Sequence, residues 1–192
     1  MFLLKRPGQN QLEEFLDQSQ KLSLSYEPVG IAKDSPSGFN VDEKVGPVGR
    51  GSEAFWRARN ALVEWRHFDL GWVKVFPERP ATEPGTVVAV LINHLGFWSL
   101  NGCRVCYEIG KRKESNVFGF AYGTLTNHAE LGEEIFEVSI DPVTEVVSYK
   151  VRAVSRPSAT LARLGYPYTR LLQQHFRRDS LAAVLRAVEH SH

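Results

Sequence analysis

Apolar and polar residues alternate along the chain between residues 86 and 155. A period of two is typical of β-strands, because successive side chains of a strand point to opposite faces of its sheet. The connections between the alternating segments are short and contain turn residues, which indicates hairpins and therefore an antiparallel sheet. Five strands are predicted in this half of the chain, over residues 86–94, 97–109, 117–125, 133–140 and 145–155.

Upstream of this region, a first strand is predicted where Phe39, Val41 and Val45 precede Gly46 and Pro47, and residues 72–75 begin another extended segment. Three other segments show the 3.6-residue period of amphipathic helices. They cover residues 9–20, residues 52 to about 67–71 with Ser52 as the predicted N-cap, and residues 158–188. The last helix is expected to kink around Gly165 and Pro167 and to turn inward Leu161, Leu164, Tyr168, Leu171 and Leu172.

The strand predicted over residues 117–125 has two unequal faces. Phe118, Phe120 and Tyr122 share one side, whereas residues 119, 121 and 123 on the other side are glycine or alanine. A strand with one bare face lets another group approach its backbone closely. That group is expected to be a packed helix or a ligand.

These elements predict an α+β protein in which a curved antiparallel sheet of about six to seven strands grips a long C-terminal helix. This order resembles the helix-grip fold of START and Bet v 1-like proteins, in which sheet and helix enclose an elongated apolar cavity. A length of 192 residues suits a single domain. Residues 1–24 are expected to form an N-terminal helical extension and residues 25–192 the helix-grip-like body.

Composition and charge exclude several classes of protein. With 43% hydrophobic residues and a net charge of +1, the chain is neither disordered nor strongly basic, so neither nucleic acid nor an anionic membrane is expected as its main partner. No apolar run is long enough to span a membrane. Cys103 and Cys106 should lie on opposite faces of one strand as reduced, structural residues. Together these features predict a cytoplasmic protein.

Several short motifs resemble the uncharacterised DUF1990 (UPF0548) family, and they run nearly from end to end. They are LKRP at 4–7, LSYEPVG at 24–30, FDLGWV at 68–73, LNGCRV at 100–105, FGFAYGTL at 118–125, GEE at 132–134 and SRP at 155–157. One departure is Thr126-Asn127-His128, where relatives typically have Pro-Gly-His. The family is named for lacking a known function, so the resemblance implies no catalytic residue.

Two histidines are candidates for chemistry, because imidazole titrates near neutral pH. His128 lies in a polar segment with Glu130 and Glu133, either of which could orient it as a general base. The alternative is a solvated hairpin loop. His94 ends a very apolar strand and could serve as a general base or a polar anchor for a ligand, or could simply be hydrogen-bonded at a hairpin end.

Tryptophans could line the cavity mouth and stack on a flat ligand, although ordinary core packing explains them equally well. The candidate ligand-binding residues are Trp65, Trp72, His94, Trp98, Tyr122, His128, Glu133 and Arg156. The histidines lack the spacing of metal ligands, so neither a metal nor a cofactor is expected.

The pattern favours a binding module for a small apolar or lipid-like ligand. Two alternatives stay open. One is an enzyme of cyclase or hydrolase type acting in the same cavity. The other is a regulatory interaction protein using the C-terminal helix, because residues 152–192 contain seven arginines against two acidic residues. The oligomeric state is not determined by the sequence.

Overall fold

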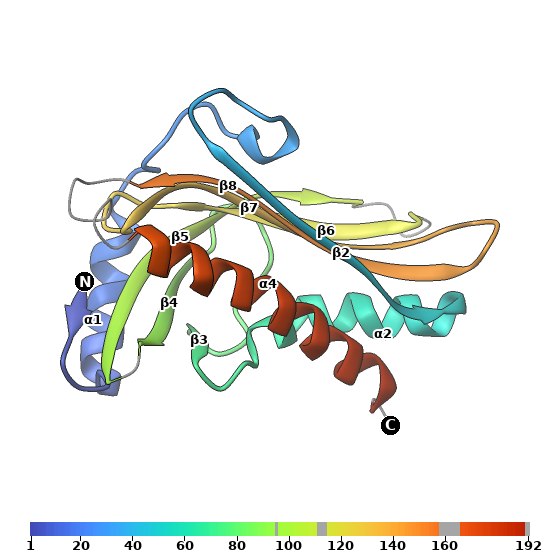
Figure 1. The fold of residues 1–192 in the computed structure, drawn as a ribbon. Helices are drawn as coiled ribbons and strands as arrows, with labels where there is room; N and C mark the ends of the chain where they lie inside the picture. Colours follow the sequence, from blue (N-terminus) through green and yellow to red (C-terminus); the bar gives the residue numbers. More distant parts are fainter. Residues whose placement is uncertain (95, 111–114, 158–165, 191–192) are drawn as a thin grey trace.

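The computed structural model describes residues 1–94, 96–110, 115–157 and 166–190. Its main element is an antiparallel sheet with the strand order β2-β8-β7-β6-β5-β4-β3, and the short β1 pairs with β5 beside it. The strands are β1 (Phe2–Leu3), β2 (Asn40–Arg50), β3 (Val73–Phe76), β4 (Val87–His94), β5 (Phe97–Ile109), β6 (Val117–Thr124), β7 (Glu130–Ile140) and β8 (Val146–Pro157). The predicted α+β class and curved antiparallel sheet are confirmed (Figure 1).

The helical elements of the described residues are α1 (Gln9–Gln20), η1 (Ile31–Lys33), α2 (Gly51–Val63), η2 (Arg66–Phe68) and α4 (Tyr166–Glu189), of which η1 and η2 are short 3-10 helices. Helices α2 and α4 lie against one face of the sheet, which we call the concave face (Figure 1). The segment around η1 crosses the opposite, convex face. The sheet is thus covered on both sides, and α4 takes the position expected of the gripped helix.

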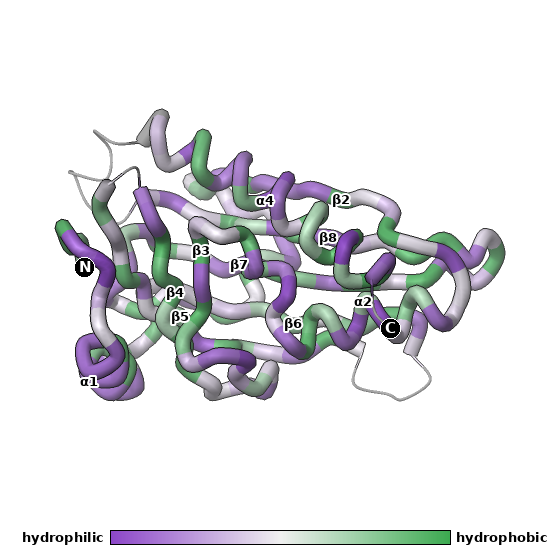
Figure 2. The backbone as a smooth tube through the Cα atoms, turned by 90° about the horizontal axis from the view of Figure 1, so that it is seen from below, coloured by the Kyte–Doolittle hydropathy of each residue, from purple (hydrophilic) through white to green (hydrophobic). Residues whose placement is uncertain are grey.

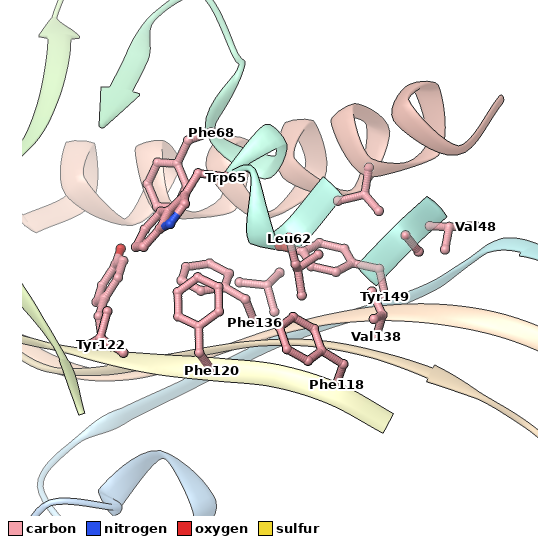
Figure 3. Packing of buried hydrophobic residues seen from close by; sticks show 14 of the residues in the cluster. Val48, Leu62, Trp65, Phe68, Phe118, Phe120, Tyr122, Phe136, Val138 and Tyr149 are labelled. Atoms are coloured by element: carbon pink, nitrogen blue, oxygen red, sulfur yellow. The ribbon is translucent and has the colours of Figure 1, made fainter. Parts of the chain in front are cut away.

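The core lies between the concave face and α2. Phe120, Tyr122 and Phe136 point from the sheet toward Trp65 and Phe68, which follow α2 (Figure 3). The ring centroids of Trp65 and Phe120 are 4.8 Å apart, so this end of the sheet is filled with aromatic side chains. Burial of this apolar surface is the main force that holds α2 against the sheet.

The bare side of β6 is on the convex face. A Cβ atom at Gly123 would overlap the Tyr26 hydroxyl oxygen, so glycine leaves the space in which Tyr26 packs. Tyr26, Ile31 and Ala32 form a separate apolar cluster with Ala121. The group that approaches the bare face is therefore the chain's own segment around η1.

Helix α1 packs on the same convex side, against β4 and β5. Most of α1 is hydrophilic (Figure 2), and its buried Phe15 contacts Leu91 and Leu100. The predicted helix over residues 9–20 is confirmed. Its treatment as an extension separate from residues 25–192 stays a prediction.

Several local predictions are wrong. Helix α2 begins at Gly51 without a side-chain cap, so Ser52 lies inside its first turn. β2 does not end at Gly46–Pro47: a bulge between Pro47 and Gly49 lets pairing with β8 continue to Arg50.

Of the residues expected to point inward from the last helix, Leu171 is 64% exposed and Tyr168 is 38% exposed. Leu161, Leu164 and the expected kink at Gly165 lie outside the described residues.

Candidate ligand-binding cavity

A cavity of about 580 Å³ lies between the concave face and α4. This volume is in the range of small-molecule sites in proteins. Apolar side chains from four elements form much of its wall: Phe68 of η2, Val90 and Ile92 of β4, Phe97 of β5, and Leu172 and Phe176 of α4. The cavity is therefore built from segments that are far apart in the sequence and meet only in the folded chain.

His94 lies at the end of the cavity formed by the β4–β5 hairpin. Its ring stacks on Phe97 with centroids 4.8 Å apart, and Phe2 lies nearby. His94 Nε2 is 2.7 Å from Ser99 Oγ, and Asn101 Nδ2 donates to the same oxygen at 3.0 Å. Burial lowers the pKa of His94, so the imidazole is neutral near pH 7.

The opposite wall of the cavity carries carboxyl groups. Glu134 points from β7 to the concave side, where the Tyr122 hydroxyl donates to its Oε2 at 2.8 Å. Burial raises the pKa of Glu134 to about 7, although the Tyr122 hydrogen bond and Arg177 act in the opposite direction. Glu130 accepts a 2.7 Å hydrogen bond from Gln173 of α4, and burial raises its pKa as well.

Arginines of α4 lie beside this polar wall. Arg177 is 3.1 Å from Asp42 of β2, and Arg170 forms a bidentate pair with the same carboxylate. Asp42 therefore neutralises part of the positive charge that the sequence concentrates in the last helix. These ion pairs also connect α4 to the edge of the sheet.

His128 does not form the predicted pair with Glu133. Its Nδ1 lies 2.9 Å from the backbone nitrogen and 3.1 Å from the carbonyl oxygen of Glu130, so this ring nitrogen is engaged with the backbone instead of with a carboxylate. Burial lowers the pKa of His128 to about 4, so the ring is neutral near pH 7. His128 lies at the cavity wall as an uncharged polar group.

Glu133 contributes to the wall, but its carboxylate is on the convex side. Oε2 accepts hydrogen bonds from the Tyr26 hydroxyl at 2.7 Å and from the Gly30 backbone N–H at 2.8 Å. Oε1 accepts from the Tyr107 hydroxyl at 2.6 Å and the Ala32 backbone N–H at 3.2 Å. Glu133 thus holds the segment around η1 on the sheet and presents no carboxylate to the cavity.

The structure divides the remaining candidates. Trp72 lines the cavity and donates from its indole to Asp179 at 3.2 Å. Trp65 lies in the core and donates to the Pro80 carbonyl at 2.9 Å. Trp98 packs on the convex side with the cluster under α1, and Arg156 lies over the ring of Phe39 at 4.7 Å. Trp65, Trp98 and Arg156 therefore do not line the cavity.

Sequence reasoning missed Glu134, Ser99, Gln173 and Arg177. A usable signal existed for Glu134: adjacent residues of a strand face opposite sides, so one glutamate of the Glu133-Glu134 pair had to face the helix side. The helical residues carried no comparable signal, because the inward face predicted for residues 158–188 was defined by apolar positions, and it included the exposed Tyr168 and Leu171 instead of Gln173 and Arg177.

Cys103 is buried on the concave side and Cys106 lies beside Tyr26 on the convex side, and both are free thiols. A bulge between Val105 and Tyr107 moves Tyr107 to the convex side as well, which corrects the simple alternation expected along this strand. Among the described residues, no group of three or more His, Cys, Asp or Glu side chains is placed to hold a metal ion. No helix in the same residues is long and apolar enough to cross a membrane.

Comparison with known sequences gives consistent matches. A family model described as "Domain of unknown function (DUF1990)" matches residues 25–183. A UPF0548 protein of Dictyostelium discoideum is 31% identical over 207 residues, covering 98% of this chain and 96% of the relative. A UPF0548 protein of Arabidopsis thaliana is 34% identical over 176 residues, covering 90% and 83% respectively.

Among solved structures, the ZhuI aromatase/cyclase from Streptomyces sp. R1128 aligns with a TM-score of 0.54 at 13% identity, covering 79% of this chain and 94% of that one. A hypothetical protein from Helicobacter pylori aligns with the same TM-score at 10% identity, covering 85% and 95%. Identities this low show a shared fold alone. The helix-grip fold predicted from the sequence is confirmed.

Proposed function

Because this chain belongs to the DUF1990 (UPF0548) family, whose description names no function, we propose from its own cavity that the protein binds a small, largely apolar organic molecule between the sheet and α4. The observation that carries the proposal is the cavity of about 580 Å³. A mostly apolar pocket of this volume between a sheet and a helix has the size and lining of the sites that hold small organic molecules in proteins.

The character of the wall supports an amphipathic ligand. Phe97, Ile92 and Phe176 offer apolar surface to the body of a ligand, and Glu134 with Tyr122 offers a localised polar contact. Ligand sites in proteins typically combine a mostly apolar lining with a few polar groups that orient the ligand. A purely structural cavity has no need of a carboxyl group on its wall.

The first test is native mass spectrometry of freshly purified full-length protein, followed by denaturing extraction of any released molecule. A co-purifying apolar molecule at near-stoichiometric mass would support the proposal. A mass equal to that of the chain alone would move the test to added ligands, for which decan-1-ol is a suitable neutral probe in isothermal titration calorimetry.

A cavity-filling variant makes that second test decisive. Ala153 of β8 lines the cavity, so Ala153→Phe should reduce decan-1-ol affinity at least about tenfold. Ser148→Phe places the same side chain on the opposite face of the same strand and should leave affinity unchanged. Thermal denaturation of both variants checks that they fold. If the unmodified protein binds no cellular molecule and none of the added probes, charged or neutral, the proposal is wrong.

A second candidate function is an enzyme acting in the same cavity, of cyclase or hydrolase type. It is favoured by titratable groups on the wall, above all the neutral His94 hydrogen-bonded to Ser99. A neutral imidazole can accept a proton from a hydroxyl group. Hydrolysis of 4-nitrophenyl decanoate by the wild type, lost in Ser99→Ala and in His94→Gln, would support this candidate.

The third candidate, a regulatory interaction through the arginine-rich helix, has less support. It would be favoured by a filled interior, whereas the cavity is large enough for a ligand. Arg170 and Arg177 are also engaged with Asp42 rather than presented to a partner.

A further inference from the structure

The carboxyl group of Glu134 lies on the cavity wall and has few hydrogen-bond partners. The Tyr122 hydroxyl donates to its Oε2 at 2.8 Å, and its Oε1 has no hydrogen-bond partner among the described residues. The side chain retains accessible surface although it lies deep in the molecule, and that surface belongs to the cavity. A carboxylate in such a place is destabilising unless a positive charge or several donors compensate for its lost hydration.

Among the described residues, compensation for this charge is only partial and comes from Arg177, which favours the ionised form of Glu134. Among the described residues that line the cavity, Arg177 is the only lysine or arginine, and it is 3.1 Å from Asp42. Arg170 is also paired with Asp42, while Glu130 adds a further carboxyl group on the same face of β7. Among the described residues of this polar wall, two arginines thus stand against three carboxyl groups, which leaves one carboxyl group without a matching positive charge.

The histidines do not make up the difference. Burial lowers the pKa of His94 and of His128, the latter to about 4, so both rings are uncharged near pH 7. A neutral wall is then reached in one of two ways: Glu134 holds a proton, or a bound ligand brings a positive charge.

We propose that the ligand of this cavity carries a positively charged amine, which lies against the Glu134 carboxylate beside the Tyr122 hydroxyl, with an apolar body extending toward Phe97. This inference rests on the proposed binding function and specifies the ligand's polar group. An ammonium group donates to Glu134 Oε1, the oxygen without a partner, and supplies the missing charge. A ligand carboxylate at this position would be repelled by Glu130 and Glu134.

The arrangement couples amine binding to the release of a proton. Burial raises the pKa of Glu134 to about 7, so the unliganded carboxyl group is half protonated at neutral pH. The charged and titratable groups around it are Glu130 of β7, Tyr122 of β6, Cys103 of β5, Tyr149 of β8, Arg177 of α4 and Asp42 of β2. Burial raises the pKa of the two tyrosines and the cysteine, so these three stay uncharged near pH 7.

This coupling sets the sign of the pH dependence. The ionised fraction of a group with a pKa of about 7 rises about tenfold between about pH 6 and about pH 8, so amine affinity should rise about tenfold over the same interval. A ligand that accepts a hydrogen bond from the protonated Glu134 would instead bind more weakly as the pH rises. The direction of the change therefore distinguishes the two ligand chemistries.

The test is isothermal titration calorimetry of the full-length protein at about pH 6, 7 and 8, with decylamine below its micelle-forming concentration and decan-1-ol below its solubility limit. Decylamine is a cation throughout this range, whereas decan-1-ol has a similar chain and no charge. At about pH 8, decylamine should bind at least about tenfold more tightly than decan-1-ol. Decylamine affinity should increase with pH and decan-1-ol affinity should not.

Variants locate the effect. Glu134→Gln should abolish both the preference for decylamine and its pH dependence while leaving decan-1-ol binding intact. Glu137→Gln, on the convex side of the same strand and ion-paired with Lys150, is the matched control and should change neither. Tyr122→Phe retains the aromatic ring and should weaken decylamine binding severalfold.

Two outcomes would overturn the inference, and they differ in what else they remove. If decylamine and decan-1-ol bind with equal affinity, and Glu134→Gln changes neither, the ligand does not carry a positively charged amine. The proposed binding function would still stand. Absence of binding for both probes, together with a ligand-free native mass, would refute the proposed function and this inference with it. Should Glu134→Gln fail to fold, the pH series on the wild-type protein still decides the matter.

Discussion

Glu133 and Glu134 are adjacent in β7 and have the same side chain, but their surroundings differ completely. On the convex side, Glu133 accepts four hydrogen bonds, from Tyr26, Tyr107 and two backbone N–H groups. On the concave side, Glu134 accepts one hydrogen bond from the described residues, donated by Tyr122, and faces a cavity. A carboxylate whose acceptor capacity is filled by the protein serves the fold. A buried carboxyl group with unused capacity is available to a ligand.

The same contrast holds for the two faces of the sheet as a whole. The segment around η1 fits the bare side of β6 so closely that Gly123 has no room for a Cβ atom. Helix α4 leaves about 580 Å³ between itself and the sheet. A closely packed face whose polar groups are all hydrogen-bonded contributes to the stability of the fold. A face with a cavity and an unsatisfied polar group is suited to ligand binding. The following changes test this distinction.

The largest effect is expected for Glu133→Ala. It leaves two tyrosine hydroxyls and two backbone N–H groups without their acceptor, so the free energy of unfolding should fall by about 3–5 kcal/mol. Urea denaturation at neutral pH measures the change. A loss below about 1 kcal/mol would show that these hydrogen bonds are not what holds the segment around η1.

Glu134→Gln should act in the opposite direction. The folded protein holds the Glu134 proton up to a pKa of about 7, against an ordinary value of 4.5, so its contribution to stability is lost as the pH rises between these values. Above about pH 7 the variant should be more stable than the wild type by about 2–3 kcal/mol, and below about pH 4.5 the two should agree. Denaturant titrations across this range measure the difference. Equal destabilisation at every pH would contradict the interpretation.

Removal of a single tyrosine hydroxyl group should also lower stability more on the convex side of the sheet than on the concave side, by a smaller amount. Tyr26→Phe takes one donor from a carboxylate enclosed by the protein and should cost about 1–2 kcal/mol of stability. Tyr122→Phe takes one from a carboxyl group that faces the cavity, where water can replace it, and should cost less than about 1 kcal/mol. Both are measured by urea denaturation. A larger loss for Tyr122→Phe would reverse the assignment of the two faces.

The smallest effect is expected for Glu137→Gln. Glu137 lies on the convex side of β7, where its carboxylate is 2.6 Å from Lys150 near the surface. Ion pairs with access to solvent contribute little, so the free energy of unfolding should change by less than about 0.5–1 kcal/mol. Thermal denaturation at two salt concentrations measures how much the ion pair contributes to stability. A loss of stability as large as that expected for Glu133→Ala would show that burial of the carboxylate does not determine how much each glutamate of β7 contributes.

Part of the cavity could be predicted from the sequence. Trp72, His94, Tyr122 and His128 reach its wall because each belongs to a strand, or to the end of one, whose period was evident. Alternation places Glu133 and Glu134 on opposite faces of the sheet, but nothing in the sequence indicates which of these faces meets the helices. The chemistry of Trp65, Trp98 and Arg156 suits a ligand site, but the structure places them in the core or on the convex side.

The sequence by itself determined the strands, their antiparallel pairing and the helix-grip arrangement, because alternation and turn residues are local properties that short segments express independently. It also determined that β6 has one bare face. Only the tertiary structure decided that this face meets Tyr26 and that Glu134, rather than Glu133, meets the cavity. Both results depend on which distant segment of the chain covers each face of the sheet. The free energy of contacts between distant segments cannot be predicted from the periodicity of a short segment.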